Sequence, residues 1–501
     1  MKKRKYITTA TILALAVATA FATNGTRMIG YDAKTVGRGG TGFGMFDNGA
    51  LLFTNPAGIS FLSNSLVEGD FSLMIPGLNF TNDINSAKGK TNYFPMGNLS
   101  YIKKGESDFT WGVGAYTQGG MGADFTLNHK LFVDQTGAYV QQKYHSKLGV
   151  MQGGLSAAYT LTPELSAGVS AHLVYSMLEF DMPYSLSPSI MKGVVNPQTG
   201  MTFGDMFAAP PQAGGFGYSE VTAAASMNKL SALGFSGKIG VAWIANENVT
   251  LGASYTSASP LTYKNGKATM DMTYQLNDAF GKAVMGVMQQ NPGMTQAQAQ
   301  QAVMTQFAQM GIDMAKGVVA QYDLETKLKF PQSVGLGGMF RLSDKARLGF
   351  DFEWINWKNA FDKMTLALKN GSNANINRML GNDGNFGLEF PMQWEDAYCT
   401  RLGIEVDATT DLTLRVGGAF GSNPVPNQTV FPVFPAIVEN HFTAGFTYKF
   451  SPVFAVNAAY ELAFNSAQTS LIPSLLASEY SGSTSELREN IFHLSFSWMM
   501  R

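Results

Sequence analysis

Charged residues are scarce in this chain of 501 residues: they make up 14% of it, and 35 basic residues stand against 36 acidic ones. About 25% is usual. So little charge is not typical of a disordered chain, and the balance of signs provides no field to attract a polyanion, so we expect no nucleic-acid partner. A single cysteine excludes a disulfide framework and a cysteine-based zinc site. Glycine (54 residues) and aromatic residues (12%) are abundant instead and favour β structure.

The sequence also lacks an uninterrupted apolar run of the length a membrane-spanning helix needs, about 20 residues. The run Ile12–Ala22 is shorter, follows the basic residues 2–5 and ends in Ala20-Phe21-Ala22. Basic residues, an apolar run and a small-x-small site are the order of a secretory signal. We therefore expect a signal peptide over residues 1–22, with cleavage after Ala20 as the alternative, and an exported mature protein.

From Ser65 onward the dominant pattern has a period of two. Within Arg347–Trp354, Phe454–Phe464 and Asn490–Trp498, large apolar residues alternate with small, polar or charged ones. Successive side chains of a strand point to opposite faces, so each run has one apolar and one polar face. A soluble β-sandwich shows the same alternation, because its apolar face lies inward.

Strand length and loop asymmetry favour a membrane barrel over a sandwich. Many runs reach ten residues, whereas strands of soluble proteins centre on about five or six. Short turns such as 342–345 and 450–452 contrast with long loops at 185–229 and 264–325. Residues 64–501 are therefore predicted to form an all-β, closed antiparallel transmembrane barrel of about 14 strands. Such a chain is a multi-pass protein of a Gram-negative outer membrane, surrounded by bilayer and lipopolysaccharide, and we expect a monomer.

Residues 23–63 do not follow the strand pattern. The stretch is rich in glycine, and its backbone polar groups could not be satisfied in lipid, so it is interpreted as an N-terminal hatch, or plug, in the lumen or periplasm. Its segment 37–42 formally matches G-x-G-x-x-G, but no apolar strand precedes it and no helix follows, which excludes a dinucleotide site.

Two helical patterns lie in the long loop 264–325. Apolar residues recur there every three or four positions, on either side of the break at Asn291-Pro292-Gly293. Their apolar faces either pack against each other and the barrel rim, or line a surface groove for apolar ligands. The candidate groove residues are Phe280, Val284, Met288, Val303, Phe307, Met310 and Met314.

Nothing in the sequence indicates catalysis. No G-x-S-x-G nucleophile elbow occurs, and the five histidines have no metal-binding spacing, so we expect no enzyme, metal or cofactor. Cys399 lies on an expected strand and is interpreted as an unreactive side chain that only packs against its neighbours. Charged residues on the expected polar faces are interpreted as an internal salt-bridge lattice: Lys238, Arg347, Asp351, Glu353, Arg415, Lys449 and Glu461.

Several motifs together resemble the FadL family of outer-membrane transporters for long-chain fatty acids and other hydrophobic compounds, which includes TodX-type hydrocarbon channels. Asn55-Pro56-Ala57 resembles the signature of the family's hatch. Trp111–Gly114, followed by Gln118–Phe125, resembles the third strand, which is kinked and leaves a gap in the wall. Trp394–Tyr398 and the segments that follow it resemble a late strand pair and its loop.

The resemblance implies passive uptake of a hydrophobic molecule. Ligand lands in the external groove, enters a lumen pocket, and leaves sideways through the kink at Gln118, Gly119, Gly120, Met121 and Gly122 after the hatch shifts. Clustered glycines independently indicate a kink or bulge there.

One departure from the family concerns the ligand. Fatty-acid members are expected to meet the carboxylate with basic residues, yet 178–181 and 394–396 offer acids. Lys238 and Arg415 are the candidate lumen contacts, and an uncharged hydrocarbon becomes an alternative to a fatty acid. Two other classes stay open: a general diffusion porin, which would lack a hatch, and a barrel enzyme, which would need catalytic residues at the lipid boundary.

Overall fold

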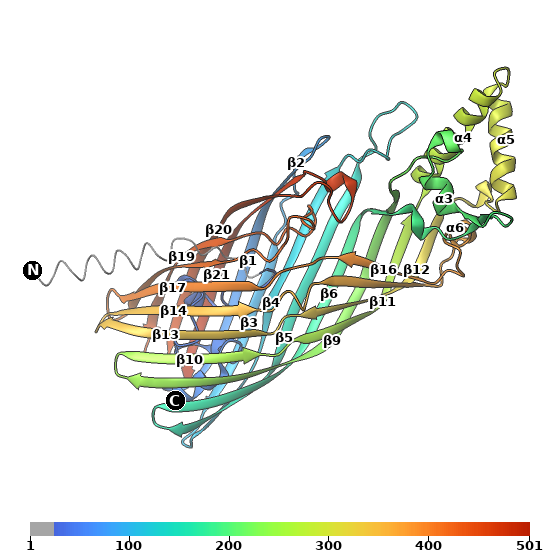
Figure 1. Cartoon of the computed structure of the whole chain (residues 1–501). Helices are drawn as coiled ribbons and strands as arrows, with labels where there is room; N and C mark the ends of the chain where they lie inside the picture. The colour runs from blue at the N-terminus through green and yellow to red at the C-terminus, as the bar shows by residue number, and fades with distance from the viewer. Residues whose placement is uncertain (1–24, 501) are drawn as a thin grey trace, which may run out of the picture.

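The computed structural model describes residues 25–500, so the expected signal peptide lies outside the described residues. Strands dominate it, and they form one closed antiparallel barrel of 14 barrel strands, as predicted (Figure 1). Some of these barrel strands consist of two consecutive β segments. In chain order the barrel strands are β1 (Ser65–Thr81), β3 (Phe94–Lys104), β4 (Phe109–Leu127), β5 (Gln142–Thr162), β6 (Leu165–Leu186), β9 (Val221–Asn246), β10 with β11 (Val249–Thr256, Ser259–Asp271), β12 with β13 (Val319–Phe330, Ser333–Ser343), β14 with β15 (Ala346–Ile355, Lys363–Lys369), β16 with β17 (Phe386–Pro391, Ala397–Asp407), β18 (Leu412–Gly421), β19 (Asn440–Ser451), β20 (Phe454–Thr469) and β21 (Thr484–Met500).

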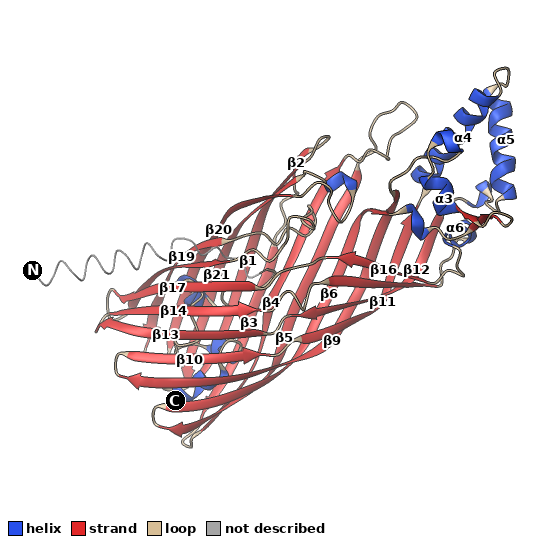
Figure 2. Ribbon diagram, viewed as in Figure 1, coloured by secondary structure: helices blue, strands red, loops and turns tan. Residues whose placement is uncertain are grey.

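The barrel closes between its first and last strands. β1 pairs with β21 along its whole length, from Ser65–Met500 to Thr81–Thr484. Tight turns join the strands at one end, and the long loops with helices gather at the other (Figure 2). Those helices are α3 (Phe203–Ala208), α4 (Thr273–Gln290), α5 (Gln296–Gln309) and α6 (Ala374–Leu380). None of the helices in residues 25–500 is long and apolar enough to cross a membrane.

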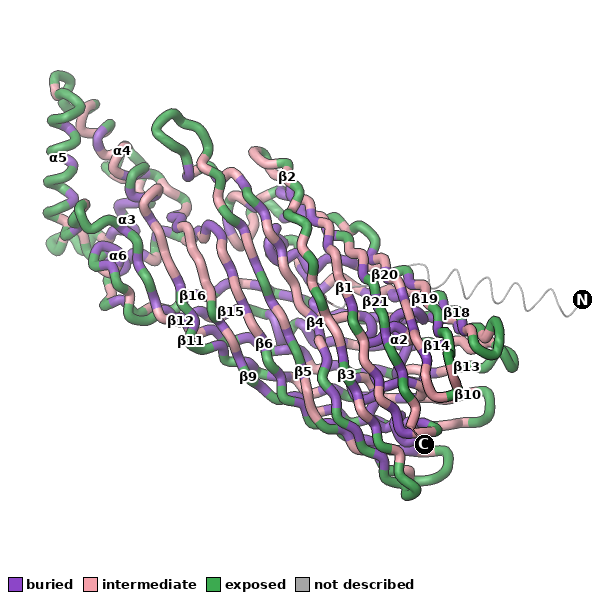
Figure 3. The backbone as a smooth tube through the Cα atoms, turned by 180° about the vertical axis from the view of Figure 1, so that it is seen from behind, coloured by how far each residue is buried: buried purple, intermediate pink, exposed green. Residues whose placement is uncertain are grey.

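Burial alternates along the strands in the predicted way (Figure 3). In β14, Phe350 and Phe352 are exposed on the outer surface while Asp351 and Glu353 are buried inside. The large apolar side chains thus face the bilayer, where lipid rather than protein covers them.

Both long loops are shorter than predicted. β6 and β9 extend to Leu186 and back to Val221, and β11 and β12 extend to Asp271 and back to Val319. Register shifts, between Tyr263 and Gly266 in β11 for example, interrupt the alternation and hide these extensions in the sequence.

The structure places residues 25–64 inside the barrel, at the end with the tight turns. We call this segment the hatch. It contains a short helix, α2 (Ala33–Gly37), and two 3₁₀ helices, η1 (Gly49–Leu52) and η2 (Pro56–Phe61). Its backbone is held by lumen-facing side chains: the Ala33 and Gly39 N–H groups donate to Ser495 and Thr443, both at 3.0 Å.

Candidate functional site

The barrel wall has a gap between β3 and β4. Their pairing stops at Asn98–Tyr116, and beyond Tyr116 β4 stays paired with β5 but no longer with β3. The β4–β5 register shifts between Thr117 and Gly119, so a bulge lies where the clustered glycines predicted one. We call the opening between Gln118–Ala123 of β4 and residues 92–96 before and in β3 the wall gap.

The start of the hatch occupies the missing strand position. Gly120 N–H donates to the Thr26 carbonyl at 3.0 Å, and Met28 N–H donates to the Gln118 carbonyl at 3.4 Å. Arg27 forms an antiparallel bridge with Gly119. A Cβ at Gly119 would overlap the Thr26 carbonyl oxygen, so only glycine allows this approach.

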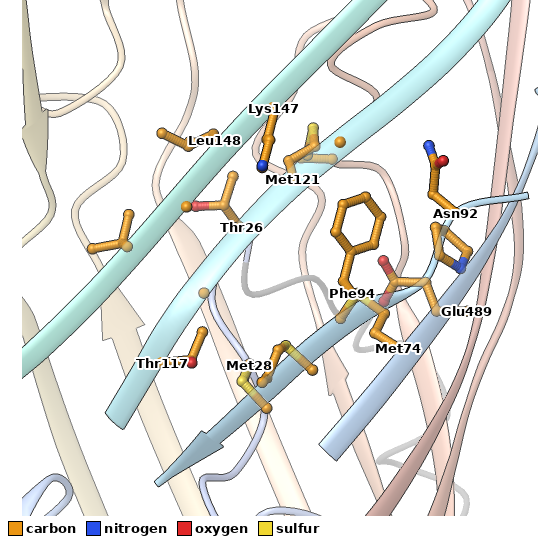
Figure 4. Close-up of a pocket in the computed structure, with 18 of the residues that line it drawn as sticks. Thr26, Met28, Met74, Asn92, Phe94, Thr117, Met121, Lys147, Leu148 and Glu489 are labelled. Atoms are coloured by element: carbon orange, nitrogen blue, oxygen red, sulfur yellow. The ribbon is translucent and has the colours of Figure 1, made fainter. Parts of the chain in front are cut away.

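A cavity of about 530 Å³ adjoins the wall gap (Figure 4). That volume falls within the range of about 300–1,000 Å³ typical of ligand pockets. Its lining joins the hatch, both sides of the wall gap and the lumen face of β19–β21. Most lining side chains are apolar, including Met28, Met74, Phe94, Met121 and Leu148.

Two buried ion-pair groups fasten the hatch to the wall. The Arg27 guanidinium lies 2.9 Å from Glu353, whose other oxygen accepts from Arg401 at 2.7 Å. Burial opposes the charge of Arg27, but the Glu353 carboxylate raises the pKa of its guanidinium. The second group centres on Glu405, which meets Arg38 of the hatch at 3.7 Å as well as Arg347 and Arg415 of the wall.

Arg38 also forms a bidentate pair with Asp47, with both N–O distances at 2.9 Å. Burial disfavours the Asp47 carboxylate, but Arg38 holds the pKa of that carboxyl well below its usual range. Of the predicted lattice, Arg347, Glu353 and Arg415 form ion pairs, and the hatch joins them through Arg27 and Arg38. Lys238, Asp351 and Lys449 form no ion pair with any of residues 25–500; Asp351 instead accepts from the Gly42 and Phe43 N–H groups of the hatch.

The Asn55-Pro56-Ala57 turn seats the hatch against β6, β9 and β10. The fully buried Asn55 amide donates to the Phe43 carbonyl at 2.9 Å and to the Val241 carbonyl at 3.0 Å. Asn55 also caps η2 by accepting from Ala57 N–H at 3.3 Å. A Cβ on Gly240 of β9 would overlap the Asn55 side chain, so glycine in the strand makes room for the turn.

The loop between β18 and β19 (residues 422–439, here the roof loop) folds into the barrel. Val430, Phe431, Val433, Phe434 and Ile437 are all buried, and Pro435, Ala436 and Val438 line the cavity. This closure was not predicted from the sequence. Its signal is an apolar run in a loop, where solvent-exposed polar residues are usual.

The remaining candidates lie away from the cavity. In α4 and α5, Val284, Val303 and Phe307 are buried, and Phe280 stacks edge-on against Phe307 at 5.9 Å, so the two apolar faces pack against each other. Met288, Met310 and Met314 pack onto the same core. Lys238 donates to Thr256 at 2.7 Å in the lumen, and Arg415 bonds to Glu405 and Thr447 beside the hatch.

The acids of 178–181 and 394–396, segments in which the resemblance implies basic contacts for a carboxylate, do not line the cavity. Asp181 pairs with Lys143 at 2.5 Å on the outer surface. Phe180, which precedes Asp181 in the strand, points inward and is buried. Asp396 accepts from Trp354 and Asn356 at 3.0 and 2.9 Å. Alternation turns the acids of 178–181 outward, and the acids that line the cavity are Asp124, Glu461 and Glu489.

A closed lipid-facing barrel with a plug and a side gap defines an outer-membrane channel. Residues 12–486 match the model of the outer membrane protein transport family (OMPP1/FadL/TodX), so the chain belongs to this family. It is an outer-membrane transport protein of a Gram-negative bacterium and not an enzyme, from a family that transports hydrophobic small molecules.

Solved structures share the fold. The toluene transporter TodX of Pseudomonas putida is 18% identical, with 95% of this chain and 100% of that chain covered and a TM-score of 0.66. A FadL homologue of Pseudomonas aeruginosa is 15% identical over 95% and 100% of the two chains, with a TM-score of 0.67. An outer-membrane protein of Neisseria meningitidis serogroup B is 24% identical over 228 residues, 45% of this chain and 41% of that protein, so the match spans less than half of it.

Proposed function

We propose that this channel carries hydrophobic molecules from the cavity through the wall gap into the outer leaflet, with Thr26–Met28 of the hatch as the gate. The observation that carries the proposal is the continuity of one cavity from the lumen to the wall gap. The three gate residues take the place of the strand that β4 lacks, so their departure would open the wall without breaking any β3–β4 pair.

The lateral route suits an apolar molecule physically. Below the cavity the lumen is filled by the hatch and its ion pairs, so a downward path would bring the molecule past buried charges. Beyond the wall gap lies hydrocarbon, where apolar surface is favoured over water. Capture at α4 and α5 remains part of the proposal, with the half-buried Phe280, Met288, Met310 and Met314 as its candidates, because Val284, Val303 and Phe307 are buried where the two helices pack together.

Sealing the wall gap with a covalent bridge tests the route. Gly122 and Phe94 face each other across it: a Cβ at Gly122 would lie 2.6 Å from the Phe94 ring. In a Phe94→Cys, Gly122→Cys double variant, a short bifunctional thiol reagent bridges the two sides, and the buried native Cys399 does not react. We expect uptake of radiolabelled toluene or oleate to fall at least tenfold after bridging, while binding to the purified protein persists.

Each single-cysteine variant treated with the same reagent is the matched control. Full uptake by the bridged double variant would show that the ligand leaves along the barrel axis. A substitution at Gly120 would be less informative, because its Cβ would lie 2.5 Å from the Leu148 carbonyl oxygen and disturb the strand pairing itself.

A further inference from the structure

One side of the cavity is polar and acidic. Three lumen-facing residues of β19, β20 and β21 line it there: His441, Glu461 and Glu489. Met74, Phe94 and the roof loop supply apolar lining around these groups, and a second polar group lies at Asp124, which is bonded to Asn92 and His145. An apolar ligand in this cavity would therefore place one end against a carboxylate.

Glu461 has its partners within the protein. Its carboxylate accepts from His441 Nδ1 at 2.8 Å and lies 3.4 Å from His493 Nε2. His493 is oriented in turn by Ser72, whose hydroxyl lies 2.7 Å from its Nδ1. This side of the cavity is therefore rigid, and Glu461 needs nothing from a ligand.

Glu489 has no hydrogen-bonded partner of this kind, although the His441 ring lies near enough to interact with it electrostatically. Its carboxylate makes no hydrogen bond or ion pair with any of residues 25–500, although it is partly buried and lies beside Phe94 and Met74 (Figure 4). Its neighbours along the inner face of β21 are Leu487 and Ile491, which cannot bond to it. A carboxylate in such surroundings is costly unless a donor meets it.

The cations around the cavity are engaged or lie elsewhere. The Arg27 guanidinium is bound by Glu353 at 2.9 Å. Lys147 lines the cavity from the exposed side of β5, at the outer rim of the wall gap. A ligand carboxylate in the lumen half would therefore meet Glu489 and Glu461 without a free cation beside it, and the like charges would repel it.

We infer that the cavity selects an apolar molecule whose polar group donates a hydrogen bond, with Glu489 as its acceptor and a protonated amine as the tightest-binding head group. This inference rests on the proposed function and names the ligand class for the same site. A charge-assisted hydrogen bond is roughly twice as strong as a neutral one, so an amine should bind better than an alcohol. The ring or chain of the ligand would occupy the apolar part between Met74, Phe94 and the roof loop.

A set of naphthalenes that differ only in one group tests the inference. The full mature chain in nanodiscs is titrated calorimetrically with 2-methylnaphthalene, 2-naphthalenemethanol, 2-naphthylmethylamine and 2-naphthoate, and empty nanodiscs supply the background. We expect the amine to bind at least tenfold tighter than the carboxylate, with the alcohol between them. Equal or tighter binding of the carboxylate would overturn the inference.

Glu489→Gln keeps the shape of the side chain and removes its charge. The amine should lose at least tenfold in affinity and the carboxylate should gain, while 2-methylnaphthalene changes less than twofold. Glu489→Leu is the second variant, should the first fold poorly, with the same loss expected for the amine. The matched control is Glu486→Gln on the same strand, whose carboxylate accepts from Asn79 at 2.9 Å away from the cavity.

The two proposals fail in different ways. If 2-methylnaphthalene binds and is taken up but the head group has no effect on affinity, the Glu489 inference is wrong and the lateral channel stands. If no naphthalene binds to the folded protein, the cavity is not the ligand site and both proposals are wrong.

Discussion

Replacing Gly119 with alanine should release the gate. The added Cβ would overlap the Thr26 carbonyl oxygen, so Thr26–Met28 must leave β4 and lose the two backbone hydrogen bonds to Gly120 and Gln118. Each bond contributes about 1 kcal/mol. Together they amount to about 2 kcal/mol, which corresponds to a roughly 30-fold larger population of the released state.

A cysteine at the gate reports this population. Thr26 is buried, so a Thr26→Cys thiol should react with a water-soluble reagent only when the segment leaves β4. We expect Gly119→Ala to increase the labelling rate by about 30-fold, because the rate is proportional to the population of the released state. Gly237→Ala on β9 is the control, because the nearest atom to its added Cβ lies 3.7 Å away. Unchanged labelling in a folded Gly119→Ala protein would refute the idea that these bonds hold the gate.

Three further predictions concern the hatch and the external loops. Deleting residues 23–63 should raise conductance in planar bilayers from near zero to the level of a porin, and low conductance in a folded deletion would contradict the plug assignment. Asp47→Asn leaves Arg38 without its bidentate partner and should cost about 3 kcal/mol of hatch stability, measured as earlier hatch exposure in denaturant, whereas Asp344→Asn in a tight turn should have no effect. Burial raises the pKa of Glu479, in the loop after β20, to about 7, so the loop should be most stable below pH 4.5 and should lose up to about 3 kcal/mol as the pH rises to 7; hydrogen exchange of this loop measures the loss, and Glu479→Gln should abolish the pH dependence.

The barrel could be predicted from local patterns because lipid imposes one rule on every strand. Phe350 and Phe352 face outward while Asp351 and Glu353 face inward, and this alternation is visible in any short window of sequence. The bulge in β4 was visible for a similar reason, since clustered glycines mark an irregular strand.

Contacts between distant segments could not be predicted in this way. No local pattern indicates that Thr26 bonds to Gly120, and the apolar run of the roof loop does not say where that loop packs, because both depend on how the closed barrel brings remote residues together. Glu489 was equally hidden. It occupies a polar-face position like that of Glu461, and only the lack of a hydrogen-bonded partner among residues 25–500 distinguishes the two.

The seam between β1 and β21 has a consequence for how the protein is assembled. It joins Ser65 to Met500, so the cylinder cannot close until the last strand of the chain is in place. The hatch precedes β1, yet its bonds reach Thr443 on β19 and Ser495 on β21. The hatch, which is synthesised before every barrel strand, can therefore take its final position only after the last strand arrives. A newly made channel therefore cannot be both closed as a cylinder and correctly plugged before its C-terminal strand is delivered.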